Sequence, residues 1–226
     1  MKIAIVVPVF NEALVLPRLI GELTALRKAA NPDFELVFVD GGSTDNTVAL
    51  IENAGLHVID SPKGRAWQMN TGAIETTADI LLFLHADTQL PANALTAIAY
   101  SLVGDICWGR FDVRIAGKAW MLAVVSSMMN WRSRMTGIAT GDQAMFMTRA
   151  AFKTIGGLPE QVLMEDIEAS KRLCQLSRPA CIATPVITSG RRWENRGVWK
   201  TIFLMWRLRW AYWRGQSPQK LAELYA

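Results

Sequence analysis

The sequence predicts an α/β fold in which helices cover both faces of a mostly parallel central sheet, in three layers. Short runs rich in Ile and Val alternate with segments whose apolar residues recur every three or four positions. The order strand, helix, strand repeats through the first half of the chain, which is typical of parallel sheets with right-handed crossovers. The 226 residues, 51% of them hydrophobic, are enough for one such core and an appendage.

The first half carries the clearest strand and helix patterns. Residues 3–9 are apolar without alternation, as in a strand buried on both faces, and we expect this strand to end near Pro8. An amphipathic helix is expected at 14–28, because its leucines recur at helical spacing. The alternation predicts further strands at 35–39, 57–59 and 80–84, and helices at 44–53 and 66–76.

The second half is less regular. Its patterns predict strands at 106–115 and 143–147, and helices at 91–102, 120–131, 149–156, 164–176 and 198–213. No segment has the roughly 18 uninterrupted apolar residues of a membrane-spanning helix. We expect a main domain at 1–190 followed by a basic and aromatic helical extension at 191–226.

Charge is distributed unevenly along the chain. Residues 1–170 contain 13 Lys and Arg against 18 Asp and Glu, whereas residues 171–226 contain 11 against two. A basic block of this kind suits phosphate, nucleic acid or an anionic membrane surface. The three cysteines form no CxxC pair, which argues against a disulfide framework or a thiolate zinc site. The first apolar run is too short for a secretory signal, so we expect a cytoplasmic protein.

Acidic and polar residues follow three of the predicted strands. Asn11 and Glu12 come after the first, the segment 40–45 after the second, and His85 and Asp87 after the fourth. Ligands of open parallel sheets bind at the carboxyl ends of the strands, so three acidic groups are expected to converge there. The alternative for 40–45 is a strand-to-helix turn capped by Ser43 or Thr44. For Asp87 the alternative is a capping role.

Four motifs in order resemble those of the family 2 glycosyltransferases, which have the GT-A fold. They span roughly residues 1–200 and read Pro8-Val9-Phe10-Asn11-Glu12, Val39-Asp40-Gly41-Gly42-Ser43-Thr44-Asp45-Asn46-Thr47, His85-Ala86-Asp87 and Met164-Glu165-Asp166. The resemblance implies transfer of a sugar from a nucleotide-sugar donor, with uridine the expected base. The longer string Ser189-Gly190-Arg191-Arg192-Trp193 is similar to a subgroup of small bacterial enzymes without a proven substrate.

The resemblance also implies which residues bind the donor. Glu12 and Asp40 would contact the uracil and ribose, and the same motifs add Pro8, Asn11 and Gly42 as nucleotide-binding positions. Asp87 would hold a Mg²⁺ or Mn²⁺ ion on the diphosphate, together with His85. His85 stands where the family more often has the first Asp of Asp-x-Asp. A hard divalent ion needs few protein ligands when phosphate oxygens complete its shell.

Residues later in the chain are implied to act on the acceptor and the leaving group. Asp166, beside Glu165, resembles the general base of inverting members, which removes the proton of the attacking hydroxyl. The alternative is that these acids only favour the first turn of a helix. Further substrate-binding positions are Glu165, Arg65 at a helix start, Asp142 in a loop before the acceptor site, and Arg191, Arg192 and Trp193 near the diphosphate or acceptor. Arg65 can equally be a solvated surface residue.

Residues 199–214 mix Trp and Arg at helical spacing. This composition suits either an interfacial helix in peripheral contact with the inner face of a membrane or a helix packed on the main domain. Nucleic-acid binding explains the basic block less well, because no recognition fold accompanies it.

The expected function is a metal-dependent glycosyltransferase that acts with inversion on an unknown hydroxyl acceptor: a glycan, a lipid or a small molecule. One alternative is a nucleotidyltransferase that makes nucleotide sugars, although the glycine-rich loop of that class is absent after the first strand. The other is a non-catalytic nucleotide-binding module at a membrane.

Overall fold

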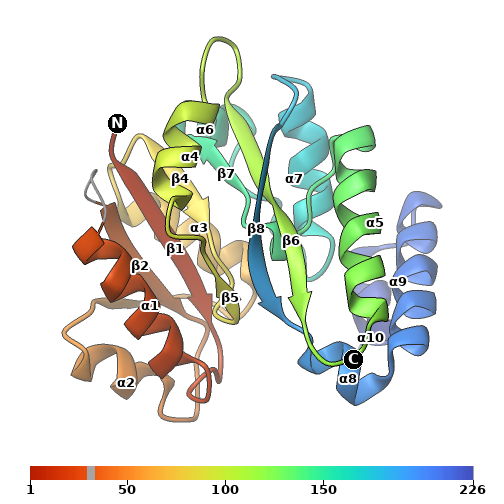
Figure 1. The fold of residues 1–226 in the computed structure, drawn as a ribbon, viewed down its shortest axis with the longest axis horizontal. Coiled ribbons are helices and arrows are strands. Elements are labelled where there is room, and N and C mark those ends of the chain that lie inside the picture. Colours follow the sequence, from red (N-terminus) through yellow and green to blue (C-terminus); the bar gives the residue numbers. More distant parts are fainter. Residues whose placement is uncertain (30–33, 226) are drawn as a thin grey trace.

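The computed structural model describes residues 1–29 and 34–225, apart from the side chains of two residues, Ala29 and Arg192. It confirms an α/β fold with helices on both sides of a central sheet (Figure 1). The strands are β1 (Ile3–Val9), β2 (Phe34–Asp40), β3 (Val58–Asp60), β4 (Ile80–Phe83), β5 (Thr88–Gln89), β6 (Trp108–Ala116), β7 (Phe146–Thr148) and β8 (Ala180–Ser189).

The helices occupy most of the remaining chain. They are α1 (Leu16–Ala29), α2 (Thr47–Asn53), α3 (Arg65–Glu75), α4 (Ala94–Ser101), α5 (Met121–Thr136), α6 (Arg149–Thr154), α7 (Glu165–Cys174), α8 (Arg191–Arg196), α9 (Val198–Trp213) and α10 (Pro218–Tyr225), with a short 3₁₀ turn η1 (Gly141–Gln143). None of the helices in the described ranges is both long and apolar enough to cross a membrane.

The strands form one sheet in the order β3-β2-β1-β4-β7-β6-β8-β5. Its first half is parallel, because β1 pairs with both β2 and β4, and β2 pairs with β3. The second half is mixed: β7 runs antiparallel to β4 and β6, β8 is parallel to β6, and β5 is antiparallel to β8. The parallel half therefore places the carboxyl ends of β1, β2 and β4 at the same edge of the sheet.

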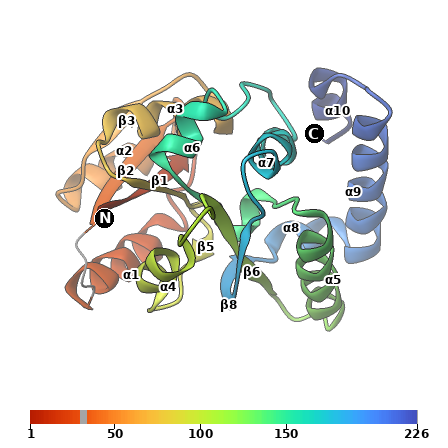
Figure 2. The same ribbon diagram turned by 90° about the horizontal axis from the view of Figure 1, so that it is seen from above.

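The two faces of the sheet bury two separate apolar clusters. Ile3 and Ile5 of β1 pack in one cluster with α1 and α4, whereas Ala4 and Val6 pack in the other with α3, α6 and α7. Successive side chains of a strand point to opposite faces, so an unbroken apolar run is what this arrangement requires. Figure 2 shows α1 and α4 on one side of the sheet and α3, α6 and α7 on the other.

The C-terminal helices gather at one end of the molecule beside α5 and α7 (Figure 2). Leu208 and Ala211 of α9 and Leu221 of α10 are buried against Met164 and Ile167 at the start of α7. This apolar cluster fixes α9 and α10 next to the loops that follow the sheet.

Helix α5 is attached to β6 through hydrogen bonds as well as packing. Asn130 accepts the N–H of Val113 at 2.9 Å and donates to its carbonyl at 3.0 Å, and Ser126 accepts the N–H of Ile115 at 2.9 Å. These side chains satisfy strand groups that β7 does not reach, because β7 pairs with β6 only at Trp108 and Gly109.

Several boundaries differ from those expected. The helix predicted to begin at residue 44 begins at Thr47, because the carboxylate of Asp45 accepts the N–H of Thr47 at 3.0 Å. The cap at Ser43 or Thr44, which the sequence allowed as part of a turn, is therefore wrong, although the turn itself is present. The strand predicted at 143–147 is displaced to Phe146–Thr148 by the turn η1. The strands β5 and β8 had no counterpart in the prediction, whereas α8 and α10 fall within the predicted helical extension at 191–226.

Candidate functional site

A cleft of about 630 Å³ opens at the carboxyl ends of β1 and β4. The C-terminal helices close its other side, because Thr201 and Met205 of α9 and Tyr225 of α10 line it. Eight of the residues predicted from the sequence line this cleft: Pro8, Glu12, Arg65, His85, Asp87, Asp142, Arg191 and Trp193. Five others do not: Asn11, Asp40, Gly42, Glu165 and Asp166.

The carboxylates of Glu12 and Asp87 lie in the cleft with the guanidinium groups of Arg65 and Arg191. Burial raises the pKa of Glu12, and the nearby carboxylate of Asp87 raises it further, whereas Arg191 and Arg65 lower it. The Arg191 Nη2 atom lies 3.9 Å from the Glu12 Oε2 atom. The acids are thus close enough to repel each other, and the arginines partly compensate. An additional cation would be stabilised at this point.

His85 separates the cleft from a smaller cavity. Its ring is largely buried, and its Nδ1 atom lies 3.5 Å from the Asp142 Oδ1 atom. A Cβ atom at Gly141 would lie 2.5 Å from the His85 ring, so only glycine allows this close packing. The imidazole, which comes from the loop after β4, is therefore held against η1.

The second cavity, about 20 Å³, is lined by His85, Gly141, Glu165 and Asp166 among others. The Asp166 Oδ2 atom accepts the N–H of Gly141 at 2.9 Å. Burial raises the pKa of Asp166, and hydrogen bonds from the N–H groups of Gly141 and Ile167 oppose that rise. A carboxylate with a raised pKa and a fixed orientation suits proton transfer.

Glu165 lies beside Asp166 in sequence but points to a different partner. Its side chain is buried, and its Oε1 atom lies 4.0 Å from the Arg65 Nη1 atom. Burial raises the pKa of Glu165, the charge of Asp166 raises it further, and Arg65 lowers it. Arg65 thus lies between the acids of the two cavities. It lines the cleft and also contacts Glu165, which lines the second cavity.

Asp40 is directed into its own loop. Its carboxylate accepts the N–H groups of Gly42 and Ser43, each at 2.8 Å, and the hydroxyl of Ser43. Gly42 has a φ of +85°, which glycine adopts without strain. The structure therefore shows the turn that the sequence allowed as an alternative. The role of Asp40 in nucleotide binding stays a prediction.

Asn11 joins the loops after β1 and β2. Its Oδ1 atom accepts the N–H of Thr44 at 2.8 Å, and its own N–H donates to Ser43 at 2.8 Å. Its φ of +54° is one that Asn tolerates better than most residues. These contacts fix the approach of the next residue, Glu12, to the cleft.

Gln68 on α3 was not predicted from the sequence. It is buried, lines the cleft, and its Nε2 atom donates to the carbonyls of Val9 at 2.7 Å and Val39 at 2.8 Å. It thereby ties together the ends of β1 and β2. A Gln inside an amphipathic helix gives no signal of this role, which depends on how the helix packs.

Arg132 on α5 was also missed. Its Nε and Nη2 atoms are buried and have no hydrogen-bond partner within the described part of the chain. Burial lowers the pKa of Arg132, the charge of Asp166 raises it, and that of Arg110 lowers it further. A cation thus lies close enough to Asp166 for the two charges to interact. Its position in an irregular half of the chain offered no pattern by which to find it.

The remaining predicted residues are Trp193 and Arg192. Trp193 lines the cleft and packs against the buried cluster of Ile115, Leu122 and Val125. The Arg192 side chain lies outside the described part of the structure, so its predicted role is not tested.

The residues of the cleft fit a divalent cation only in part. Within the described ranges, no three His, Cys, Asp or Glu side chains gather closely enough to hold a metal by themselves. Asp87, half-buried beside Glu12, supplies a hard oxygen ligand, and Mg²⁺ commonly takes one or two carboxylates plus phosphate oxygens and water. These ligands therefore suit a cation when the oxygens of a bound diphosphate complete its coordination shell.

Solved structures of similar fold include a mannosyltransferase, PcManGT from Pyrobaculum calidifontis, in complex with GDP-Man and Mn²⁺. It has a TM-score of 0.68 and 20% sequence identity, and the match covers 92% of this chain and 60% of that one. S. aureus TarS 1-349 in complex with UDP-GlcNAc has a TM-score of 0.66 and 18% identity, over 84% of this chain and 58% of that one.

A third similar structure is glucosyl-3-phosphoglycerate synthase from Mycobacterium tuberculosis, in complex with Mg²⁺ and UDP. Its TM-score is 0.61 with 18% identity, over 83% of this chain and 70% of that one. At such identities the likeness establishes the fold, and it confirms GT-A. The chain spans less than two thirds of the TarS and PcManGT chains.

The sequence itself matches the family model described as glycosyl transferase family 2 over residues 4–155. That range contains the loops that follow β1, β2 and β4, and so about half of the residues that line the cleft. The chain belongs to glycosyl transferase family 2.

Proposed function

We propose that the protein transfers a sugar from a nucleoside-diphosphate sugar, with uridine as the base, to a hydroxyl group of an acceptor. The observation that carries this is the cleft at the ends of β1 and β4, where Glu12 and Asp87 share about 630 Å³ with Arg65 and Arg191. Membership of the family supports it. Such a mixture of acids and guanidinium groups suits a ligand that brings both a cation and phosphates.

Asp87 would hold a Mg²⁺ or Mn²⁺ ion, with His85 as a second ligand or a neighbour that orients one. When bound, such an ion supplies Lewis-acid stabilisation of the charge that grows on the departing diphosphate. Arg65 and Arg191 would take part of the same charge through their guanidinium groups. The base and ribose would lie toward Glu12 and Asp40, at the ends of β1 and β2.

Asp166 would accept the proton of the attacking hydroxyl. In an inverting reaction the hydroxyl oxygen attacks the anomeric carbon from the face opposite the leaving nucleoside diphosphate, and its proton passes to a base. His85 lines both the cleft and the cavity that contains Asp166, so an acceptor would approach the base past this imidazole. The N–H of Gly141 holds the carboxylate in place.

The two alternatives make different predictions. A nucleotidyltransferase would release diphosphate and join a sugar phosphate to a nucleotide, without transferring the sugar. A non-catalytic module would bind nucleotide sugars and leave them intact. Neither alternative requires a base such as Asp166 in the adjoining cavity.

Thermal denaturation with a panel of nucleotide sugars, with and without Mn²⁺, tests the proposal. A ligand that binds only the native state raises the melting temperature, and a donor at 100 times its Kd adds about 2.7 kcal/mol to the stability. We expect UDP-sugars to raise the melting temperature in the presence of Mn²⁺, and Arg191→Ala to reduce the rise.

The matched control is Arg178→Ala, which removes an exposed arginine that does not line the cleft. The donor found in this way is then incubated with the enzyme and candidate acceptors, and the products are identified by mass spectrometry. Stabilisation by no nucleotide sugar, or release of diphosphate without sugar transfer, would contradict the proposed function.

A further inference from the structure

Two helices expose large apolar side chains in regular stripes. On α5 and its N-terminal flank the stripe is Trp120, Val124, Met128, Trp131 and Met135; on α9 it is Trp199, Phe203, Trp206, Trp210 and Trp213. Steps of three and four residues keep each stripe on one side of its helix. We call these ten side chains the α5–α9 face.

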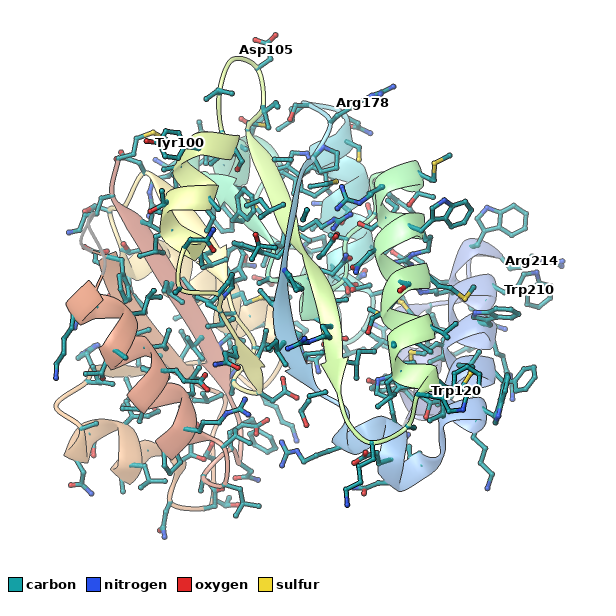
Figure 3. The ribbon with its side chains drawn as sticks, in the orientation of Figure 1. Tyr100, Asp105, Trp120, Arg178, Trp210 and Arg214 are labelled. Carbon is teal, nitrogen blue, oxygen red and sulfur yellow. The ribbon has the colours of Figure 1, made fainter. Side chains whose placement is uncertain are left out.

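The two stripes belong to one surface. Leu122 and Val125 of α5 are in the same apolar cluster as Val198 and Ile202 of α9, so the helices adjoin. Figures 1 and 2 both show them side by side at one end of the molecule. In Figure 3, Trp120 and Trp210 lie at this end, with their rings outside the ribbon.

Packing on the protein's own core does not explain this face. The inward sides of both helices are already buried: Leu122 is 1% exposed and Leu208 is 0% exposed, whereas Trp210 is 60% exposed and Trp213 is 79% exposed. Soluble monomers seldom leave more than a few hundred Å² of contiguous apolar surface in water. A surface of this kind marks a site of interaction.

A stripe of positive charge accompanies the tryptophans of α9. Lys200, Arg207 and Arg214 are exposed and lie seven residues apart, each directly after a Trp of the stripe. No ion pair within the described residues engages any of the three. Neither 121–136 nor 198–213 contains Asp or Glu.

We propose that the α5–α9 face binds the surface of a bilayer that contains anionic phospholipids. Tryptophan rings with neighbouring Lys and Arg are the side chains of helices that lie in the plane of a membrane interface. Anionic headgroups complement the charge of Lys200, Arg207 and Arg214. A second copy of this chain does not, because pairing two such faces would bring like charges together.

The orientation of α9 gives this contact a consequence for the cleft. Thr201 and Met205, which lie on another side of the same helix, line the cleft. A helix with its side chains is about 10 Å across, so docking through the tryptophans would place the cleft within roughly that distance of the headgroups. This inference depends on the surface of α5 and α9 and is independent of the proposed reaction.

Flotation of the purified protein with vesicles tests the inference. We expect binding to vesicles of equal parts phosphatidylcholine and phosphatidylglycerol, much weaker binding to phosphatidylcholine alone, and loss of binding as salt is raised. The double variant Arg207→Glu, Arg214→Glu should bind the anionic vesicles at least about tenfold more weakly than the wild type. Trp206→Glu with Trp210→Glu should bind more weakly still.

The matched control replaces an exposed aromatic residue and an exposed arginine that lie outside the α5–α9 face. Tyr100, which is 80% exposed on α4, and Arg178 lie away from the α5–α9 face in Figure 3. Tyr100→Glu with Arg178→Glu should bind like the wild type, and circular dichroism checks that every variant is folded. The wild type failing to float with anionic vesicles, or the control losing binding equally, overturns the inference. So does light scattering that shows a dimer dissociated by the tryptophan variant.

Discussion

Replacement of Asp166 by Asn is expected to lower turnover about 100- to 10,000-fold, the usual contribution of a positioned general base, and to leave donor binding unchanged. The amide keeps an oxygen that can accept the N–H of Gly141, so the loop around η1 should be retained. What is lost is the ability to take a proton from the acceptor. Steady-state rates and donor affinity by calorimetry measure the two effects separately.

The same variant has an opposite expected effect on stability. Burial raises the pKa of Asp166 above its ordinary value of 3.8. The native carboxyl keeps its proton to a higher pH than the unfolded one, so stability falls as the pH rises between the two pKa values. Asn avoids this penalty, and the variant should melt at an equal or higher temperature at neutral pH. Wild-type activity should fall as the pH drops through the raised pKa.

Glu168→Gln is the control for this experiment. Glu168 stands in the same first turn of α7, lines neither cavity, and lies 3.4 Å from the Arg172 Nε atom. If the acids only favoured the helix start, Glu168→Gln and Asp166→Asn would have similar effects. Near-normal turnover of Asp166→Asn with intact donor binding would remove this residue from the mechanism.

Asp87→Asn is expected to reduce activity about 100-fold or more, because a bound metal ion stabilises the charge that develops in the transition state by several kcal/mol. Chelation of divalent ions should reduce the wild type to a similar level, and added Mn²⁺ should restore the wild type but not the variant. The charge of Asp87 raises the pKa of Glu12, so the variant should also bring that pKa closer to its ordinary range. Rates at varied Mn²⁺ concentration measure the loss of activity and whether Mn²⁺ restores it.

An exposed aspartate outside the cleft provides the control. Asp105 lies on the loop before β6, at the far edge of the molecule from α8 (Figure 3). Asp105→Asn should respond to chelation and to Mn²⁺ like the wild type. Full activity of the wild type after complete chelation would show that no metal takes part.

The first half of the fold could be predicted because its central strands, β1 and β4, are buried on both faces. Ile3–Val9 and Ile80–Phe83 are continuous apolar runs, and burial on two sides leaves no other composition open to them. The strand β8 could not be predicted in the same way. Residues 183–185 of it are exposed, Pro185 lies within it, and its pairing with β6 shifts at a bulge between Phe111 and Asp112.

The site was predictable where strand ends determine position. Glu12 and Asp87 follow β1 and β4, which pair directly with each other in the parallel half of the sheet, and they meet in the cleft as expected. The direction of a side chain within a turn is a different matter. Asp40 also follows such a strand, yet its carboxylate binds the N–H groups of Gly42 and Ser43. Gln68 acts through tertiary packing, which local sequence does not reveal.

The location of bound Mn²⁺ and nucleotide tests the central claim most directly. Crystals grown or soaked with UDP and Mn²⁺ should show an anomalous Mn²⁺ peak in contact with Asp87 and the diphosphate, with Arg65 and Arg191 on the phosphate oxygens. A nucleotide bound outside the cleft at the ends of β1 and β4, or a Mn²⁺ ion with no contact to Asp87, would contradict the account.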